Sequence, residues 1–276
     1  MSKVRIDVLL HERGLYASRE AARRAVMAGL VKVDGERMDK PGTKVHEDIV
    51  IDVTVPEHNY VSRGGLKLER ALERFQVSVT DRVAIDVGAS TGGFTDCLLQ
   101  NGASHVFAVD VGYGQLAWSL RNDPRVTVME RTNFRHVDEL QFQPTPSLAV
   151  MDVSFISTKL LLPKLAVVCT EEADIISLIK PQFEAGRESV GKGGIIRDPQ
   201  VHYRVLMDML DYVTSMGWSC YGLDYSPISG GDGNIEFLAW WKMQGSAQAS
   251  DWESASAALV AEAWRVLEHR EITLER

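Results

Sequence analysis

Cysteine is scarce in this sequence, and long apolar runs are missing. Its 276 residues include three cysteines, Cys97, Cys169 and Cys220, which stand far apart and form no C-x-x-C pair. The seven histidines do not cluster with them, so we expect neither disulfides nor a metal site. No segment approaches the roughly 18 apolar residues of a membrane span. The first residues also lack the apolar stretch of a secretion signal, so we expect a cytoplasmic protein without a membrane partner.

Basic charge is not in excess either. The chain has 30 Lys and Arg against 38 Asp and Glu, a formal net charge of −8, which argues against broad nonspecific binding to nucleic acid. The acidic excess lies after residue 60, whereas the first 60 residues are balanced. A local basic face in the first part of the chain therefore stays compatible with the composition.

The sequence does contain a glycine-rich segment directly after an apolar run. Residues 83–85 are followed by Asp-Val-Gly-Ala-Ser-Thr-Gly-Gly-Phe at 86–94. A buried strand that ends in such a turn lets the backbone lie close to a ligand. A second apolar run ends at Asp110, near the ~20-residue interval between a glycine-rich loop and the acid that binds ribose hydroxyls. The pattern predicts a site for a cofactor that carries adenosine.

Two common cofactor classes are excluded by single positions. A dinucleotide loop needs glycine where Ser90 stands, and a triphosphate loop needs lysine where Phe94 stands. S-adenosylmethionine has a ribose and no phosphate, and D-x-G-x-x-x-G-G resembles the loop that binds it. We expect Asp110 to bind the ribose and the loop to surround the methionine end, while Asn133 either contacts the adenine or only shapes a turn. The cofactor-binding candidates are Asp86, Gly88, Ala89, Ser90, Thr91, Gly92, Gly93, Phe94, Asp110, Val111, Asn133 and Asp152.

Strands and helices should alternate from residue 81 onward. We expect strands at 83–87, 105–110, 126–130, 147–152, 174–180, 219–224 and 235–241. This order predicts an α/β fold, a Rossmann-like class I methyltransferase domain with a seven-stranded, mostly parallel sheet and helices on both faces. The last two strands could be antiparallel, an ending that suits methyltransferases better than dehydrogenases.

The first 60 residues predict a small α+β unit. Helical spacing covers 5–13 and 18–29, with Ser18 as N-cap, and strands are expected at 30–33 and 45–53. The segment resembles the alpha-L RNA-binding motif of a ribosomal small-subunit protein, pseudouridine synthases and tyrosyl-tRNA synthetases. Arg19, Arg23 and Arg24 on the second helix suit an RNA backbone; a solvated surface with intrahelical ion pairs is the alternative.

We divide the chain into four parts. Residues 1–60 form the RNA-binding domain, 61–80 a linker and a helix that carries Lys67, 81–245 the catalytic domain, and 246–276 a linker and a C-terminal helix. The last helix, capped by Asp251, either packs against the catalytic domain or docks a partner.

Ionisable residues stand at three further strand ends, where ligands bind in parallel sheets. Asp152 and Lys180 close two strands, and Glu236 stands at the start of the seventh. No prolines follow Asp152, which excludes the tetrapeptide of amino-group methylation, and neither Cys169 nor Cys220 is placed as the nucleophile that carbon methylation needs. A lysine flanked by carboxylates suits a hydroxyl target instead.

Lys67, Asp152, Lys180 and Glu236 match, in order and strand context, the catalytic tetrad of the FtsJ-type ribose 2′-O-methyltransferases. Together with the first domain and the runs at 62–65, 88–95, 110–116 and 180–184, residues 4–242 resemble the TlyA family. Its members are described both as haemolysins and as ribosomal RNA (cytidine-2′-O)-methyltransferases. The resemblance implies S-adenosylmethionine as cofactor, methylation of a ribose 2′-hydroxyl, and ribosomal RNA or ribosomal subunits as partners.

The resemblance also implies roles for these side chains. Lys180 is the candidate base, provided that its surroundings favour the neutral amine, while Lys67 could orient the hydroxyl and Glu236 could hold Lys67. Phe155 and Phe183 either stack on an extruded nucleotide or pack in the core, and residues 184–198 form either a basic lid or a plain surface loop. The RNA-binding candidates are Arg5, Arg19, Arg23, Arg24, Lys32, Arg63, Phe155, Phe183, Arg187 and Lys192.

Two other functions compete with this one. A pore-forming haemolysin is disfavoured because no membrane span or leader is expected, and a non-catalytic RNA-binding assembly factor is disfavoured because the tetrad and the glycine-rich loop are intact.

Overall fold

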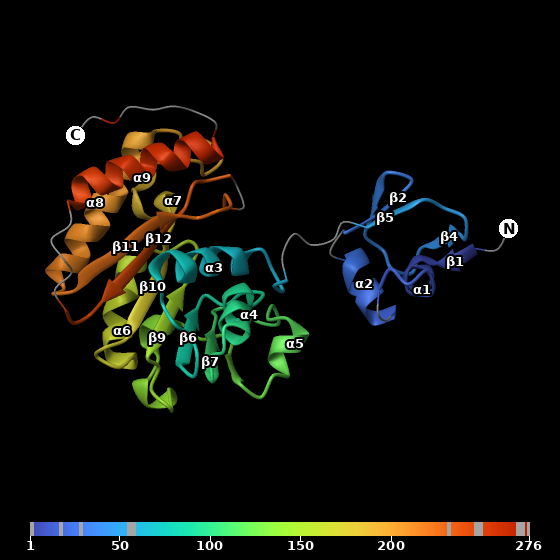
Figure 1. The fold of residues 1–276 in the computed structure, drawn as a ribbon, viewed down its shortest axis with the longest axis horizontal. Coiled ribbons are helices and arrows are strands. Elements are labelled where there is room, and N and C mark those ends of the chain that lie inside the picture. Colours follow the sequence, from blue (N-terminus) through green and yellow to red (C-terminus); the bar gives the residue numbers. More distant parts are fainter. Residues whose placement is uncertain are drawn as a thin grey trace. The chain divides into compact units, whose positions relative to one another are not determined.

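The computed structural model describes residues 3–16, 19–27, 30–53, 59–230, 233–245, 251–268 and 274, without the side chains of Ala21 and Arg24. The chain forms two compact units, residues 1–59 and 60–276, and each is described by itself (Figure 1). The predicted N-cap at Ser18 and the linker at 246–250 lie outside the described residues.

The first unit is a small α+β fold, as the sequence predicts. Helices α1 (Ile6–Glu12) and α2 (Arg19–Met27) share one buried core with the strands. Strand β2 (Val31–Val33) lies between β3 (Glu36–Met38) and β5 (Ile51–Val53), all antiparallel. The β2–β3 turn has positive φ at Asp34 and Gly35, which a two-residue hairpin of this kind requires.

The prediction of a single strand at 45–53 is wrong. The structure has two strands there, β4 (Lys44–His46) and β5, and they belong to different sheets, because β4 pairs with the unpredicted β1 (Lys3–Arg5). Between them, the Arg13 guanidinium donates hydrogen bonds to the carbonyls of Glu47 and Ile49. Those carbonyls are therefore satisfied by a side chain instead of a neighbouring strand, and the chain turns from one sheet to the other.

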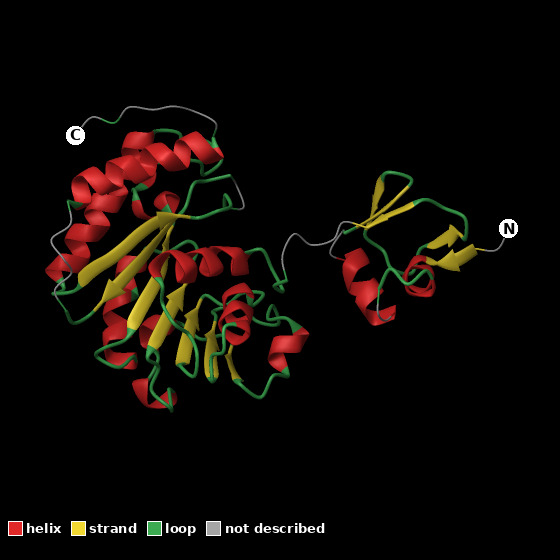
Figure 2. Cartoon of the chain, in the orientation of Figure 1, coloured by secondary structure: helices red, strands yellow, loops and turns green. Residues whose placement is uncertain are grey.

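The second unit is built on the predicted seven-stranded sheet (Figure 2). Its order is β11-β12-β10-β9-β6-β7-β8. Strands β8, β7, β6, β9 and β10 run parallel, and β12 lies antiparallel between β10 and β11. The bounds are β6 (Val83–Val87), β7 (His105–Val109), β8 (Val126–Met129), β9 (Leu148–Met151), β10 (Asp174–Ile179), β11 (Ser219–Tyr225) and β12 (Phe237–Lys242).

Each face of the sheet carries its own core. Along β6, Ala84 belongs to one buried cluster, whereas Ile85 and Val87 belong to the other. Successive side chains of a strand point to opposite faces, and both faces are covered by helices, so the central strands are mostly apolar. Asp86 in β6 and Ser177 in β10 are buried polar exceptions. The helices are α3 (Gly64–Phe75), α4 (Gly93–Gln100), α5 (Trp118–Arg121), α6 (Leu162–Val168), α7 (Pro181–Glu184), α8 (Pro199–Ser215) and α9 (Trp252–Leu267), and the short 3-10 turns are η1 (Phe134–His136), η2 (Glu139–Gln141), η3 (Thr158–Leu160) and η4 (Arg187–Ser189).

Helix α3 is an integral part of the second unit. Leu68, Ala71 and Leu72 are buried in the same cluster as α4 and the strands, and the compact unit begins at Tyr60. The Tyr60 hydroxyl donates to Glu69 Oε1 at 2.7 Å, which fastens the start of the unit to this helix. Lys67 is thereby carried by a rigid element.

Helix α9 packs against the second unit, which is one of the two roles expected for it; the other was docking of a partner. The Asp251 side chain accepts a hydrogen bond from the Ser254 amide and caps it. Val260, Ala263 and Trp264 are buried in the cluster that also holds α8. The Trp264 indole donates to His202 Nδ1 at 2.9 Å, so the helix is fixed against α8 by a buried hydrogen bond.

Candidate active site

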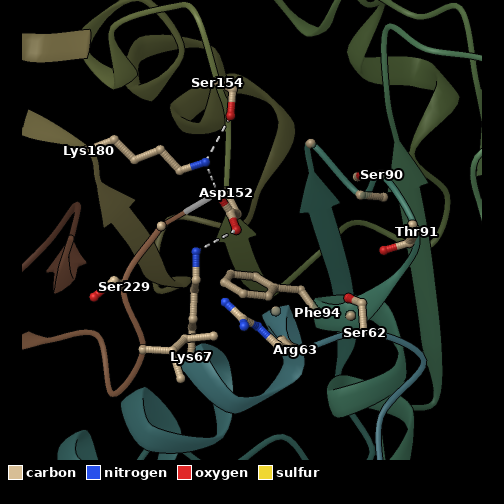
Figure 3. A pocket seen from close by; sticks show the side chains of 16 residues that line it. Ser62, Arg63, Lys67, Ser90, Thr91, Phe94, Asp152, Ser154, Lys180 and Ser229 are labelled. Carbon is tan, nitrogen blue, oxygen red and sulfur yellow. Dashed lines mark hydrogen bonds and ion pairs between the residues drawn. The ribbon is translucent and has the colours of Figure 1, made fainter. Parts of the chain in front are cut away.

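The structure brings the four tetrad residues together at one edge of the sheet. Asp152 and Lys180 follow the parallel strands β9 and β10. Strand β12 is antiparallel to β10, so its beginning, preceded by Glu236, meets the same edge. Lys67 reaches this edge from α3, and Figure 3 shows it and Lys180 approaching Asp152 from different sides.

The tetrad forms a chain of alternating charge. Lys180 Nζ lies 2.6 Å from Asp152 Oδ1, and Lys67 Nζ lies 3.7 Å from Asp152 Oδ2. Lys67 Nζ also donates to Glu236 Oε2 at 2.5 Å. A single carboxylate, that of Asp152, thus holds both lysines, and each lysine is desolvated enough for the pairing to be strong.

Glu236 is the most buried member of the tetrad, with 3% of its side chain exposed. Burial raises the pKa of its carboxyl, and the neighbouring Lys67 ammonium opposes that rise. Gly230 lies against this carboxylate, because a Cβ there would come within 2.5 Å of Glu236 Oε1. The loop that carries Gly230 therefore closes over the pair.

Helices α3 and α4 approach each other through glycines beside the tetrad. A Cβ on Gly93 would lie 2.4 Å from Ser62 Oγ and 2.8 Å from the Gly65 nitrogen. A Cβ on Gly65 would collide with the Tyr60 ring at 2.3 Å. The glycines of both predicted runs are thus required for packing, and they bring Lys67 up to the glycine-rich loop.

The glycine-rich loop turns sharply after β6. Gly88 and Gly92 have φ values of 88° and 97°, and Ser90 has a φ of 48°. A Cβ on Gly88 would lie 2.4 Å from the carbonyl oxygen of Asp152, so only glycine fits between the loop and the tetrad.

Asp110 lies across from the loop at the end of β7. Its carboxylate accepts hydrogen bonds from the Ser90 amide at 2.7 Å and from the Gly112 amide at 2.6 Å.

Asp86 lies behind the loop and is fully buried, and its Oδ2 accepts from Thr95 Oγ1 at 2.7 Å. Burial raises the pKa of Asp86 to about 7, so the carboxyl behind the loop is mostly neutral below that pH.

Two adjoining cavities share Gly88, Ser90, Asp152 and Ser154. The tetrad cavity has a volume of about 260 Å³ and is polar, with Ser62, Arg63, Lys67, Lys180 and Ser229 among its lining residues. The second cavity has a volume of about 390 Å³. It is lined by Val87, Gly88, Ser90, Val109, Asp110, Val111, Gln115, Thr132, Asn133, Phe134, Asp152, Val153, Ser154, Phe155, Ile156 and Leu161.

Asn133 and the two phenylalanines lie at or beside the second cavity. The Asn133 side chain accepts a hydrogen bond from the Arg135 amide, so it shapes a turn and lines the cavity as well. Phe155 is 90% exposed with a φ of 64°, and its ring centroid lies 5.1 Å from that of Phe183. The alternative that Phe155 packs in the core is therefore wrong.

The RNA-binding candidates on the loop at 184–198 do not line the two cavities. Arg187 and Lys192 are exposed and line neither cavity. The far part of the loop is anchored, because Asn234 accepts from the Ile196 amide and donates to the Gly194 carbonyl. Arg63, by contrast, lines the tetrad cavity.

The basic candidates of the first unit are exposed and partly paired. Arg5 and Arg19 both bind the buried carboxylate of Asp7, at 2.9 and 3.2 Å. Arg23 pairs with Glu20 within α2 at 3.4 Å. Lys32 points outward from β2, and the Arg24 side chain lies outside the described residues.

Several residues at or beside the site were not predicted, Gln115 and Phe134 of the second cavity among them, and two others have direct hydrogen-bonding roles. Ser154 accepts a hydrogen bond from Lys180 Nζ at 2.9 Å, and Glu184 accepts hydrogen bonds from Ser157 and Thr158. The only sequence signal for Ser154 was its place two residues after Asp152. A serine is common in turns, so that position alone did not distinguish a ligand of Lys180.

The described residues show no group of His, Cys, Asp and Glu that could hold a metal ion. All three cysteines are free and buried, and burial raises the pKa of each thiol to about 12. Among the helices of the described part of the chain, none is long and apolar enough to cross a membrane.

Comparison with known proteins matches both units to families. Residues 60–243 match the FtsJ-like methyltransferase model, and residues 4–51 match the S4 domain. The chain is 56% identical to YqxC of Bacillus subtilis over 89% of this chain and 88% of YqxC. It is 46% identical to the 16S/23S rRNA (cytidine-2′-O)-methyltransferase TlyA of Mycobacterium tuberculosis, over 88% of this chain and 91% of that protein.

Two further relatives carry a different label. Hemolysin A of Brachyspira hyodysenteriae is 41% identical over 86% of this chain and 98% of its own length. A solved structure from Streptococcus thermophilus, described as a candidate hemolysin, superposes with a TM-score of 0.76 at 48% identity and covers 98% of both chains.

Proposed function

Since the chain belongs to the FtsJ-like methyltransferase family and carries an S4 domain ahead of the catalytic unit, we propose that it methylates a ribose 2′-hydroxyl of ribosomal RNA. S-adenosylmethionine is the proposed methyl donor. A cytidine is the proposed target, because the name of the mycobacterial relative gives a cytidine 2′-hydroxyl as the target of that protein. The observation that carries the proposal is the assembled chain of Glu236, Lys67, Asp152 and Lys180 beside the glycine-rich loop.

The residues present fit the cofactor. Asp110 offers a carboxylate to the ribose hydroxyls, and Val111 and Phe134 offer apolar surface to a purine. Gly88 lets the loop backbone lie directly against the Asp152 carbonyl, because a Cβ there would come within 2.4 Å of that oxygen. When bound, S-adenosylmethionine supplies an electrophilic methyl group on a positively charged sulfur.

The tetrad supplies proton transfer and positioning. Lys180 in its neutral form takes the proton of the ribose hydroxyl, since it lines the cavity and ends at Ser154 and Asp152. Asp152 orients Lys180 and Lys67 together, and Glu236 fixes Lys67 from behind. Such preorganised charges stabilise a transition state without reorganisation during the reaction.

RNA contacts are proposed on both units. In the first unit, basic side chains bind the phosphate backbone. They are the exposed Arg5, Arg19, Arg23 and Lys32, together with Arg24. In the second unit Arg63 faces the substrate inside the tetrad cavity.

Two further RNA contacts involve aromatic rings and a loop. The Phe155–Phe183 pair stacks on the target nucleotide. The exposed Arg187 and Lys192 contact RNA farther from the reaction.

One experiment tests the proposal and its competitors. The purified protein is incubated with radiolabelled S-adenosylmethionine and separated ribosomal subunits, and ribose methylation is mapped by resistance to alkaline cleavage. A single new site supports the proposal and names the nucleotide. Cofactor binding without transfer to either subunit favours an RNA-binding assembly factor, and leakage of lipid vesicles by the protein would favour the hemolysin label of its relatives.

A further inference from the structure

The segment after β9 is fastened at both ends to the segment after β10. Residues 152–158 are called the β9 loop here. At its start, Lys180 binds Asp152 Oδ1 at 2.6 Å and Ser154 Oγ at 2.9 Å. At its end, the loop is held by Glu184, the last residue of α7.

Glu184 accepts three hydrogen bonds with one carboxylate. Ser157 Oγ donates to its Oε2 at 2.5 Å, and the amide and hydroxyl of Thr158 donate to its Oε1 at 2.7 and 2.9 Å. Thr158 is only 2% exposed. Hydrogen bonds to an ionised carboxylate are stronger than those between neutral groups, so this end of the β9 loop is firmly held.

Phe155 lies between the two fastened ends in an unfavourable conformation. Its φ of 64° is rare for a bulky residue, and its ring is 90% exposed beside Phe183. Strained backbone of this kind persists only where the surroundings hold it, and it is concentrated at functional sites. The Glu184 hydrogen bonds begin two residues after Phe155, and they restrain its far side together with the packing of Ile156 against the core.

We propose that Glu184 is a positioning residue for methyl transfer: it holds the β9 loop so that the Phe155 ring stays exposed at the second cavity, which Phe155 lines. The last step, stacking of this ring on the target nucleotide, rests on the proposed function. Lys180 holds the other end of the loop independently, so loss of Glu184 frees the ring without dismantling the Asp152–Lys180 pair.

Kinetics on three variants test the proposal. Glu184→Ala removes all three acceptors and should slow single-turnover methyl transfer by about 10-fold, whereas Glu184→Gln, which keeps an oxygen for Thr158, should stay within about 3-fold. Glu188→Ala, an exposed carboxylate in the same segment, is the matched control. In a Phe155→Ala background, Glu184→Ala should cause no further loss, because coupled residues are not additive. An equal loss in both backgrounds would overturn the proposal.

A second readout needs neither RNA nor cofactor. Chymotrypsin cleaves after exposed phenylalanines, so a released β9 loop in Glu184→Ala should be cut at Phe155 about 10-fold faster than in the wild type, Glu184→Gln or Glu188→Ala. Circular dichroism and thermal unfolding confirm that each variant is folded. An unchanged cleavage rate in Glu184→Ala would overturn the claim that Glu184 restrains the β9 loop at Phe155. Faster cleavage in a protein that methylates no ribosomal RNA supports the hold and overturns the proposed function alone.

Discussion

The Nζ atom of Lys67 lies 2.5 Å from the Oε2 atom of Glu236, although 169 residues separate the two in the chain. Both side chains are nearly buried, with 10% and 3% exposed. Asp152 lies 3.7 Å from the same ammonium, so the buried positive charge is matched by carboxylates on two sides. We therefore expect the pair to affect stability as well as the proposed methyl transfer.

Removing the buried partner of Lys67 should destabilise the second unit. Glu236→Ala leaves the ammonium with one distant carboxylate and should lower the free energy of unfolding by about 3 kcal/mol, which corresponds to roughly 6–12 °C in the unfolding midpoint. The apolar pair Lys67→Met with Glu236→Leu should recover most of that loss while remaining inactive. Thermal and urea unfolding measure both. Equal instability of the single and the paired variant would show that the charge itself is not the cause.

Loss of the proposed base should abolish methyl transfer and spare cofactor binding. Lys180→Ala removes the amine between Asp152 and Ser154, and the affinity for S-adenosylmethionine should change by no more than about 3-fold, since Lys180 lines only the tetrad cavity. Label transfer and isothermal titration give the two quantities. Lys164→Ala, on the surface of α6, is the control. Full activity of Lys180→Ala would remove this lysine from the role of base.

The stability of the second unit should depend on the ionisation of Asp86. Burial raises its pKa to about 7, the Thr95 hydroxyl opposes the rise, and the Asp152 and Asp110 carboxylates add to it. A carboxyl of the unfolded chain titrates near ~3.9, so the folded state binds the extra proton between about pH 4 and pH 7. Stability therefore falls as the pH rises through that window.

The Asp86→Asn variant removes this ionisation and keeps an acceptor for Thr95. Its stability relative to the wild type should rise between about pH 4 and about pH 7 in urea unfolding. A difference that stays constant over this range would show that Asp86 does not titrate there.

RNA affinity should depend on an arginine of the first unit and not on an equivalent one elsewhere. Arg23 and Arg265 each pair with a glutamate one turn earlier in their helix. Arg23→Ala should weaken RNA binding and reduce the slope of log affinity against log salt by about 1, with cofactor affinity unchanged. Arg265→Ala should leave both unchanged. Filter binding at several salt concentrations distinguishes them, and equal effects of the two variants would argue against an RNA contact by α2.

The sheet was predictable because its central parallel strands are mostly apolar on both faces, so each forms a short, nearly continuous apolar run between turns. The prediction of one strand at 45–53 was wrong because the break between β4 and β5 depends on Arg13. This residue is distant in sequence, and its guanidinium donates hydrogen bonds to the carbonyls of the turn. The proximity of the four tetrad side chains was expected from the family resemblance in their order and strand context, while their catalytic roles stay a prediction. Glu184 was not expected, because its acceptor role arises only when α7 lies beside the β9 loop. The exposure of Phe155 likewise follows from a backbone angle that composition does not reveal.

The position of β12 has a consequence for biosynthesis. This strand pairs with β10 on one side and β11 on the other, and it brings Glu236 to the edge where the other three members of the tetrad lie. A nascent chain that has emerged only as far as β11 has an edge strand without its neighbour and a Lys67 without its buried counter-ion. The four side chains can therefore come together only after residues 236–242 have been synthesised, long after Lys67.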